Sequence, residues 1–284
     1  MKAASLPSWV NGRPQAEIGL QNRGLAYGDG FFETIAVSDG NALLLPLHLE
    51  RVRQSAQKLK LTVDQIALEK EIAIAIGEAQ KYIALADSFI LKVILCSAFK
   101  GRGYQRPQSF TGTHRILQIF PLSSLDRCST QTVKIGLSDY HLPHNDKLAG
   151  IKHLNRLDQI LAGFTLNKDI DELLMCSVAG DVVEGSKTNL FIVKNDCVYT
   201  PKIDRCGVSG VMRQFLLNEI IPAAGLPYIE KRLFIRDLIK ADELFLTNSI
   251  IGIWPVRSFA VHHYQKGVIT RRLQLLLAQH ELKT

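Results

Sequence analysis

One lysine of this chain stands where a side chain can be held in a fixed direction. Lys152 lies in the run L-A-G-I-K-H-L-N-R-L, residues 148–157, two positions after Gly150. The apolar residues around and after it recur at three- and four-residue steps, which predicts that a loop or strand end passes into an amphipathic helix at this lysine. These residues are Leu154, Leu157, Ile160, Leu161 and Phe164. In a partly buried site the amine of Lys152 could act as a nucleophile or a base, whereas the ordinary alternative is a solvated surface charge.

A carboxylate and an amide stand five residues apart further along the chain. Glu184 and Asn189 belong to the run V-V-E-G-S-K-T-N-L-F-I-V, which begins a predicted strand after the turn Ala179-Gly180-Asp181. Residues 180–188 nearly spell a phosphate-binding loop, but serine occupies the place of the required lysine and a strand follows instead of a helix. We therefore exclude that motif. Glu184 is either a site carboxylate or an exposed acid beside a glycine turn.

Three further features are suited to an anion. Arg51 lies three residues after His48 in a predicted helix, and its planar guanidinium matches a phosphate through paired hydrogen bonds. A glycine-rich turn at residues 206–210 opens a second predicted helix, so the N–H groups of its first residues have no partner within the helix. Thr247-Asn248-Ser249 ends a predicted strand with two hydroxyl groups. The alternatives are a solvated arginine, a local hydrogen-bonding role for His48 and an ordinary helix cap.

The run G-R-G-Y, residues 101–104, interrupts two predicted strands and carries Arg102 and Tyr104. Such a loop either contacts a substrate or simply connects a hairpin. His141 and His144 are separated by a proline and lack a third ligand nearby, so we predict no metal site there.

The elements that must position these residues form two α/β regions. We expect a smaller N-terminal domain at residues 1–120, a polar linker at 121–131 and a larger domain at 132–284. In the first domain we predict a hairpin at 8–18, strands at 31–37, 42–45, 89–96 and 114–120, and helices at 46–61 and 64–81. In the second we predict strands at 132–140, 172–178, from 182 onwards and at 243–246, helices from 211, at 235–241 and at 270–282, and an element boundary at Pro255. The glycines at 24, 28 and 30 open a strand and not a helix, which excludes a dinucleotide-binding fingerprint.

Composition is that of an ordinary globular protein. The 284 residues are 46% hydrophobic and 21% charged, and no apolar run is long enough to cross a bilayer. The N-terminus lacks the apolar core of a signal peptide, and five cysteines without a C-x-x-C pair predict neither a disulfide framework nor a zinc site, so we expect a cytoplasmic protein. A net charge of +7 is scattered along the chain, and we expect no nucleic-acid or membrane partner.

Taken together, these motifs resemble those of the fold-type IV pyridoxal-phosphate enzymes. The run G-I-K-H-L-N-R is similar to their active-site lysine segment, and the H-x-x-R and E-x-x-x-x-N patterns occur in the family's order over nearly the whole chain. The resemblance implies two α/β domains with the cofactor at the domain interface. It also implies a homodimer in which a loop of the partner borders each site.

The resemblance assigns a role to each candidate residue. Lys152 would be joined to the aldehyde of pyridoxal 5'-phosphate, and Glu184 would face the pyridine nitrogen. Nearby positive charge from Arg51 and Arg156 would help Lys152 to become neutral. The remaining cofactor-binding residues would be Asn189 and a phosphate-binding set formed by Arg51, the amides of Val211 and Met212, Ser249 and Asn248.

Within this family, the segment K-H-L-N-R-L is similar to that of the aminodeoxychorismate lyases. Branched-chain aminotransferases usually have tyrosine where this chain has Arg156, and the lyases share the loop G-R-G-Y. The resemblance implies a lyase that converts 4-amino-4-deoxychorismate to 4-aminobenzoate and pyruvate for folate biosynthesis, with Lys152 as the general base. Arg102, Tyr104 and Arg156 are candidates to hold the substrate carboxylates, and Tyr27 is a further substrate candidate. A branched-chain or D-amino-acid aminotransferase and a basic binding protein without catalysis remain as alternatives.

Overall fold

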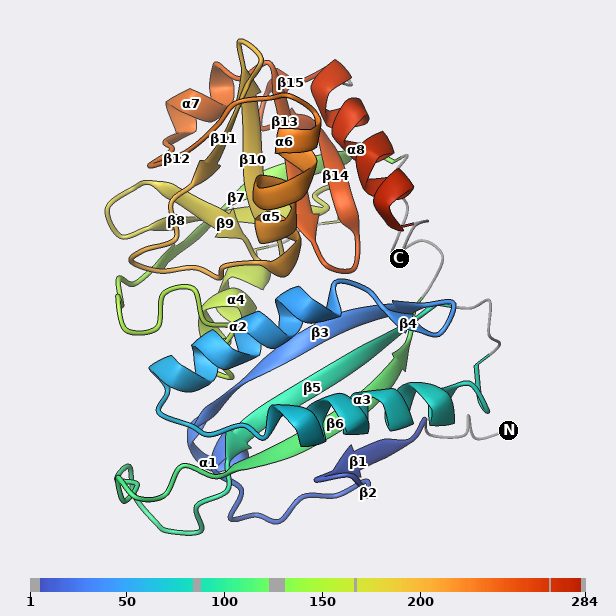
Figure 1. The fold of residues 1–284 in the computed structure, drawn as a ribbon. Helices are drawn as coiled ribbons and strands as arrows, with labels where there is room; N and C mark the ends of the chain where they lie inside the picture. Colours follow the sequence, from blue (N-terminus) through green and yellow to red (C-terminus); the bar gives the residue numbers. More distant parts are fainter. Residues whose placement is uncertain (1–5, 84–87, 123–130, 166–167, 266, 282–284) are drawn as a thin grey trace. The chain divides into compact units, whose positions relative to one another are not determined.

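The chain is divided into two compact units. The computed structural model describes residues 6–83, 88–122, 131–165, 168–265 and 267–281 (Figure 1). The first unit comprises residues 1–126 together with 152–155, and the second comprises residues 127–151 and 156–284. The linker that we predicted at 121–131 falls mostly on residues 123–130, which lie outside the described residues.

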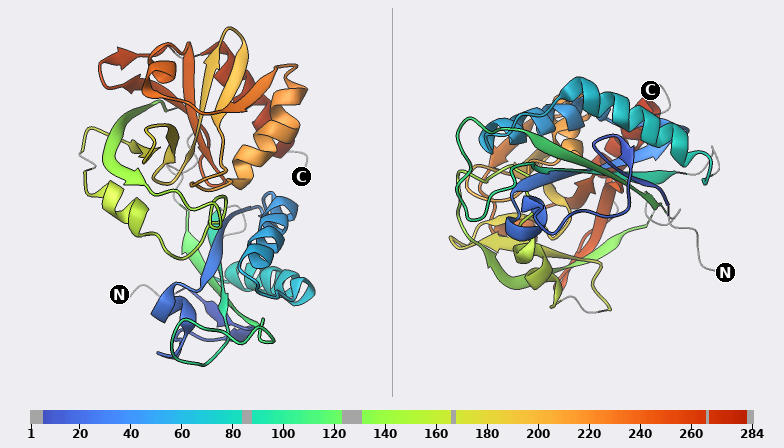
Figure 2. Two further views of the ribbon diagram at one scale, coloured as in Figure 1. Left: turned by 90° about the vertical axis from the view of Figure 1, so that its left-hand side faces the viewer. Right: turned by 90° about the horizontal axis from the view of Figure 1, so that it is seen from below.

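The first unit is an antiparallel sheet covered by helices. Its strand order is β2-β1-β6-β5-β3-β4. The strands are β1 (Ser8–Val10), β2 (Arg13–Pro14), β3 (Gly30–Ser38), β4 (Asn41–Ala42), β5 (Phe89–Ser97) and β6 (Thr113–Pro121). The helices are α1 (Arg23–Tyr27), α2 (Leu45–Lys58) and α3 (Gln65–Ala79). Figure 2 shows α2 and α3 side by side over one face of this sheet, where they bury its apolar side chains.

Local sequence explains most of these elements. The hairpin predicted around Asn11-Gly12 is confirmed by β1 and β2, and Asp64 caps α3 by accepting a hydrogen bond from the amide of Ala67. The return strand predicted at 42–45 is shorter than expected, because the chain already enters α2 at Leu45, with Pro46 in the first turn.

The second unit is built around a larger, curled sheet. Its strand order is β12-β11-β10-β13-β14-β7-β8-β9, and β15 pairs with β14. The strands are β7 (Val133–Leu142), β8 (Glu172–Ser177), β9 (Val182–Gly185), β10 (Asn189–Lys194), β11 (Cys197–Pro201), β12 (Tyr228–Lys231), β13 (Glu243–Asn248), β14 (Gly252–Phe259) and β15 (His262–His263). The helices are α4 (Leu157–Gly163), α5 (Val211–Phe215), the π-helical segment η1 (Leu216–Ile220), α6 (Ile221–Ala223), α7 (Ile235–Ile239) and α8 (Val268–Glu281).

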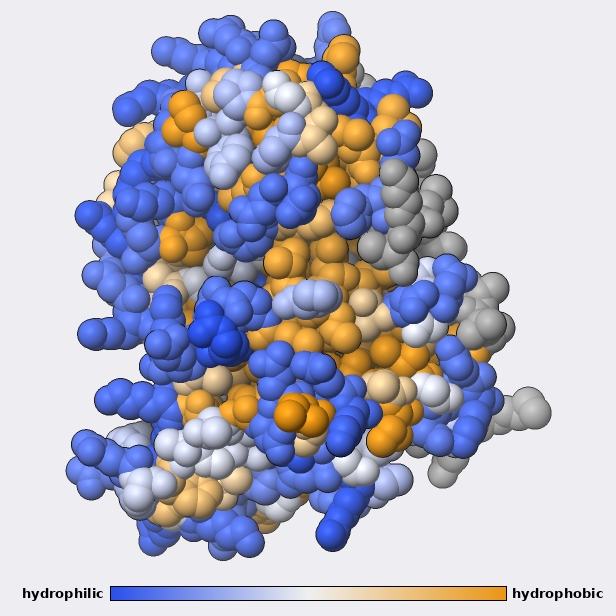
Figure 3. Space-filling view, in the orientation of Figure 1, coloured by the Kyte–Doolittle hydropathy of each residue, from blue (hydrophilic) through white to orange (hydrophobic). Residues whose placement is uncertain are grey.

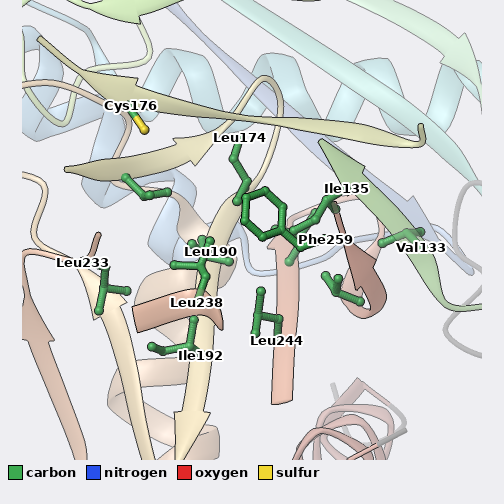
Figure 4. Close-up of a cluster of buried hydrophobic side chains, with 13 residues drawn as sticks. Val133, Ile135, Leu174, Cys176, Leu190, Ile192, Leu233, Leu238, Leu244 and Phe259 are labelled. Carbon is green, nitrogen blue, oxygen red and sulfur yellow. The ribbon is translucent and has the colours of Figure 1, made fainter. Parts of the chain in front are cut away.

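An apolar core fills the inside of this curl. Figure 4 shows side chains from β7, β8, β10, β13 and β14 pointing toward one another. The labelled members are Val133, Ile135, Leu174, Cys176, Leu190, Ile192, Leu233, Leu238, Leu244 and Phe259. Close packing of this kind makes the sheet rigid, and with it the ends of β9, β10 and β13, where the turns described below begin. On the face seen in Figure 3, hydrophilic side chains cover much of the periphery.

Two predicted boundaries are wrong. The helix that we expected to begin at Lys152 begins at Leu157, because hydrogen bonds to β3 hold residues 152–154 extended. Pro255 does not end an element but lies within β14, opposite Phe245 of β13. Proline is tolerated there because the pairing of β14 with β7 begins only at Val256. Among the described helices, none is long and apolar enough to cross a membrane.

Candidate active site

Lys152 is fixed by its backbone in the first unit. The amide of Phe32 donates to the carbonyl of Lys152 and the amide of Leu154 donates to the carbonyl of Gly30, both at 3.0 Å. The half-buried side chain of Lys152 places its Nζ 4.7 Å from the centre of the Phe32 ring, and Nζ of Lys92 lies 5.4 Å from the same centre. The segment therefore aims the amine from a strand-like backbone that is tied to β3.

Arg51 belongs to a buried group of three residues in the same unit. Its Nε donates to Oε1 of Glu33 at 2.8 Å and its Nη2 donates to Oε2 at 2.5 Å. His48, one helical turn earlier on α2, contacts the same Oε2 through Nδ1 at 2.6 Å. His48 thus has a hydrogen-bonding role, but the local partner that we considered is wrong, because Glu33 lies 15 residues away on β3. Sequence reasoning missed Glu33, whose only signal was a carboxylate within an apolar strand.

The pKa values in this group indicate which members carry charge. Burial alone would raise the pKa of Glu33, but the charge of Arg51 and the hydrogen bonds from His48 and Arg51 outweigh it and hold the pKa at about 2. Burial lowers the pKa of His48 and outweighs the opposing effect of Glu33, and Arg51 and Lys152 lower it further. His48 is therefore neutral at pH 7, with its Nδ1–H donating to Glu33. Its buried Nε2 has no hydrogen-bond partner among the residues that the structure describes.

Glu184 and Asn189 lie together in the second unit. Oε2 of the buried Glu184 accepts a hydrogen bond from the amide of Val208 at 2.8 Å, and Nδ2 of Asn189 donates to the carbonyl of the same residue at 2.9 Å. Gly150, two residues before Lys152 in the sequence, pairs with the same turn through bonds to Gly207 and Ser209. Glu184, Asn189 and Gly150 therefore all form hydrogen bonds with the same backbone turn, residues 207–209.

Glycine is required twice in this turn. Gly207 has a φ of 84°, and a Cβ there would lie 2.7 Å from Cγ1 of Val183. A Cβ on Gly210 would lie 2.0 Å from Oδ1 of Asn189. Neither position has room for a Cβ, so both must be glycine. Without side chains at these positions, the turn packs close against β9 and β10.

The helix that follows begins at Val211 without a side-chain cap. Val211 and Met212 are buried, and helical structure continues from α5 through η1 and α6 to Ala223. The first-turn N–H groups have no partner within the helix, so this terminus attracts an anion. The π-helical segment ends two residues before Pro222, which cannot donate a helical hydrogen bond.

The turn after β13 is held mainly by Asn248. Its Oδ1 accepts from the amides of Ile250 and Ile251, each at 2.9 Å, and its Nδ2 donates to the carbonyl of Lys187 at 3.1 Å. The side chain of Asn248 is thus used to shape the turn, while Ser249 stands at its tip and stays a predicted phosphate ligand.

A second buried carboxylate supports the loop between Glu184 and Asn189. Glu172, on β8, accepts from the amide and hydroxyl of Ser186, from the amide of Lys187 and from the hydroxyl of Thr188. Sequence reasoning missed this role, because the four donors lie 14 to 16 residues further along the chain.

Arg156 lies half-buried just before α4 in the second unit. Burial lowers its pKa, while the negative charges of Glu184 and Asp158 oppose that effect. The positive charge of Arg156 therefore interacts with the negative charge of Glu184, and its role at the site stays a prediction.

Three of the four substrate candidates, Tyr27, Arg102 and Tyr104, lie in or beside the loop 101–104. The hydroxyl of Tyr27 accepts from the amide of Gly103 at 3.0 Å, and the rings of Tyr27 and Tyr104 pack edge to face with centres 5.6 Å apart. Tyr104 is 88% exposed and Arg102 is exposed as well. Tyr27 thus braces the loop, whereas Arg102 and Tyr104 project from it. Arg23, which sequence reasoning did not select, also contacts this loop.

The candidate residues are distributed over both units. The first unit contains Tyr27, Arg51, Arg102, Tyr104 and Lys152, and the second contains Arg156, Glu184, Asn189, Val211, Met212, Asn248 and Ser249. Each unit holds its candidate residues by its own hydrogen bonds. The first unit combines Lys152 with Arg51, and the second combines Glu184 with the start of α5 and Ser249.

Residues 30–259 match the family model of amino-transferase class IV, and the chain belongs to this family. It is 31% identical over 273 residues to the aminodeoxychorismate lyase of Vibrio harveyi, covering 94% of this chain and 97% of that protein. A solved structure of 4-amino-4-deoxychorismate lyase from Pseudomonas aeruginosa is 38% identical, with a TM-score of 0.88 and coverage of 96% and 98%. D-alanine aminotransferase of Listeria monocytogenes is 25% identical, covering 92% and 90%. The fold class expected from the sequence is thereby confirmed.

Proposed function

We propose that this protein is a pyridoxal-phosphate-dependent lyase that converts 4-amino-4-deoxychorismate to 4-aminobenzoate and pyruvate. The observation that carries the proposal is the 38% identity and TM-score of 0.88 to a lyase structure, over 96% of this chain. The segment K-H-L-N-R-L, with Arg156 after Asn155, supports the same choice.

The residues fit the cofactor group by group. A lysine amine suits its aldehyde, and a buried carboxylate suits its pyridine nitrogen because a neighbouring negative charge favours the protonated form. Arg51, the uncapped start of α5 and the hydroxyl of Ser249 suit its phosphate. When bound, the cofactor supplies an electron sink that stabilises negative charge at the substrate carbon.

The chain's own residues then move one proton and hold the reactants. Lys152 removes the proton from the ring carbon that carries the amine, and the carbon–oxygen bond to the enolpyruvyl group breaks as the ring becomes aromatic. The departing enolpyruvate takes up a proton to become pyruvate. Glu184 accepts a hydrogen bond from the amide of Val208, which holds its carboxyl group in one direction. Arg102, Tyr104 and Arg156 are the proposed partners of the substrate carboxylates.

The proposal includes a homodimer. Its support is a stripe of exposed apolar side chains along α4, on a helix whose only fully covered residue is Ala162. The stripe consists of Leu157, Ile160, Leu161 and Phe164. Exposed apolar patches of this kind mark association surfaces more often than free surface.

The second candidate is an aminotransferase of the same family, favoured by the likeness to D-alanine aminotransferase. One experiment separates the two. The purified protein is incubated with 4-amino-4-deoxychorismate, and in parallel with D-alanine or a branched-chain amino acid and 2-oxoglutarate. We expect 4-aminobenzoate and pyruvate in equal amounts in the first reaction. Sustained amino transfer without 4-aminobenzoate would replace the lyase by the aminotransferase.

A further inference from the structure

Arg23 is a buried arginine outside the set of residues assigned so far. It is the first residue of α1 and its side chain is 2% exposed. A guanidinium that loses its water must find partners for its five N–H groups. The partners that it finds lie in one loop and one turn.

The loop is residues 101–104. Nη1 of Arg23 donates to the carbonyls of Gly101 and Gly103 at 3.2 and 2.9 Å, and Nη2 lies 3.4 Å from the carbonyl of Tyr104. The guanidinium also stacks over the Tyr27 ring, with Cζ 4.7 Å from its centre. One side chain thus holds the backbone of the loop from which Arg102 and Tyr104 project.

The turn is Gly28-Asp29-Gly30, between α1 and β3. Nε of Arg23 donates to Oδ2 of Asp29 at 2.8 Å. The carbonyls on either side of Asp29 receive hydrogen bonds from the lysine segment, that of Gly28 from Nδ2 of Asn155 and that of Gly30 from the amide of Leu154. Arg23 therefore connects the loop, through one carboxylate and one short turn, to the segment that carries Lys152.

We propose that Arg23 is a positioning residue that fixes loop 101–104 for substrate binding, relative to the Lys152 segment of the same unit. Lysine cannot replace it, because a single ammonium cannot reach the three carbonyls and the carboxylate that the planar fork spans. The part of this inference that concerns substrate rests on the proposed function. The part that concerns the loop does not.

The test compares Arg23→Lys with Arg115→Lys. Arg115 is also an ion-paired arginine of the first unit, bound to Glu71 at 2.7 Å, but it has no contact with the loop, so its variant controls for a general loss of stability. The first measurement is limited trypsin cleavage after Lys100 and Arg102. We expect Arg23→Lys to be cut about tenfold faster than the unaltered protein and Arg115→Lys to be cut at the unaltered rate.

The second measurement is steady-state formation of 4-aminobenzoate. We expect Arg23→Lys to raise KM about tenfold with a smaller change in kcat, and to leave the cofactor absorption of the purified protein unchanged. Faster cleavage with unaltered KM would overturn the role in substrate binding, and unaltered cleavage would overturn the role in the loop. If Arg23→Lys does not fold, Asp29→Asn, which keeps the turn but loses the charge, is measured in the same way. If the unaltered protein makes no 4-aminobenzoate, the proposed function fails while the cleavage comparison still decides the loop.

Discussion

The direction of the Lys152 amine depends on the main chain more than on its own side chain. Two backbone hydrogen bonds to β3 place the segment, and they survive any substitution that keeps an L-residue there. Lys152→Ala should therefore fold normally, lose the covalent cofactor and form no 4-aminobenzoate. Borohydride reduction followed by peptide mass spectrometry measures the adduct, and a thermal melt measures the fold.

Lys92 is the control for this substitution, because its amine lies near the same Phe32 ring. Lys92→Ala should retain the adduct on residue 152. An adduct found on Lys92, or retained in Lys152→Ala, would show that the wrong lysine has been assigned.

His48 makes stability depend on pH. Its pKa is lowered from 6.5 by burial, so the unfolded chain binds a proton more readily than the folded protein as the pH falls through about 6.5. The free energy of unfolding should therefore decrease from pH 7 to pH 5, by at most about 1.4 kcal/mol per pH unit for this group. The pKa of Glu33, lowered from 4.5 to about 2, keeps that carboxylate charged over this interval, and its stabilisation is lost only as the pH falls from about 4.5 toward 2.

Urea unfolding of His48→Gln at pH 7, 6 and 5 measures this contribution. Glutamine still donates to Glu33 but does not titrate. The free energy of unfolding of the variant should therefore be lower at pH 7 and should decrease less between pH 7 and pH 5. The pKa of His114 is also lowered by burial, and His114→Gln shows how much of the slope comes from that residue. An unaltered slope in His48→Gln would mean that His48 is not the group responsible.

How far the sequence predicts a residue depends on where its partners lie. Lys152, Glu184 and Asn189 stand in short motifs whose spacing is visible, and the structure gives each a fixed backbone or a hydrogen bond. Glu33 and Arg23 were not predicted, since their partners are 15 to 18 and 78 to 81 residues away, apart from Asp29. Only the fold brings such pairs together.

At the scale of elements, the predicted strands and helices follow local signals closely and fail where a distant strand intervenes. The strand predicted at 89–96 is confirmed by β5, whose apolar side chains alternate between buried and partly exposed positions over most of its length. The helix predicted from Lys152 begins five residues late, because residues 152–154 form backbone hydrogen bonds with β3, more than 100 residues earlier in the sequence. Apolar periodicity carries no information about hydrogen bonds to a distant strand.

The loop between β9 and β10 depends on Glu172. Both of its oxygens accept hydrogen bonds from backbone amides and side-chain hydroxyls. Glu172→Gln replaces one acceptor by an NH2 group, which leaves the amide of Lys187 or the hydroxyl of Thr188 without an acceptor. We expect the free energy of unfolding to decrease by about 2 kcal/mol. Urea unfolding measures it, and Glu78→Gln, in an exposed pair with Lys81, should change little. Equal losses in the two variants would contradict a special role for Glu172.

At the scale of the whole molecule, the exposed apolar side chains of α4 are the basis of the proposed dimer. The side chains of Leu157 and Phe164 are 69% and 78% exposed, at the two ends of the apolar stripe. If a second copy covers this stripe, introducing charge there opposes burial and weakens the dimer. We expect Leu157→Glu with Phe164→Glu to raise the dimer dissociation constant at least about 100-fold, since the two most exposed apolar side chains of the stripe are lost from the contact.

Sedimentation equilibrium over nanomolar to micromolar concentrations measures this constant. Val268→Glu, at the start of α8, places the same charge on another residue that is 81% exposed and should leave the association unchanged. Because the proposed dimer brings a loop of one copy to the site of the other, dissociation of the double variant should also raise KM for 4-amino-4-deoxychorismate on dilution. An unaltered protein that sediments as a monomer at all concentrations, or a control that dissociates like the double variant, would exclude α4 as the dimer surface.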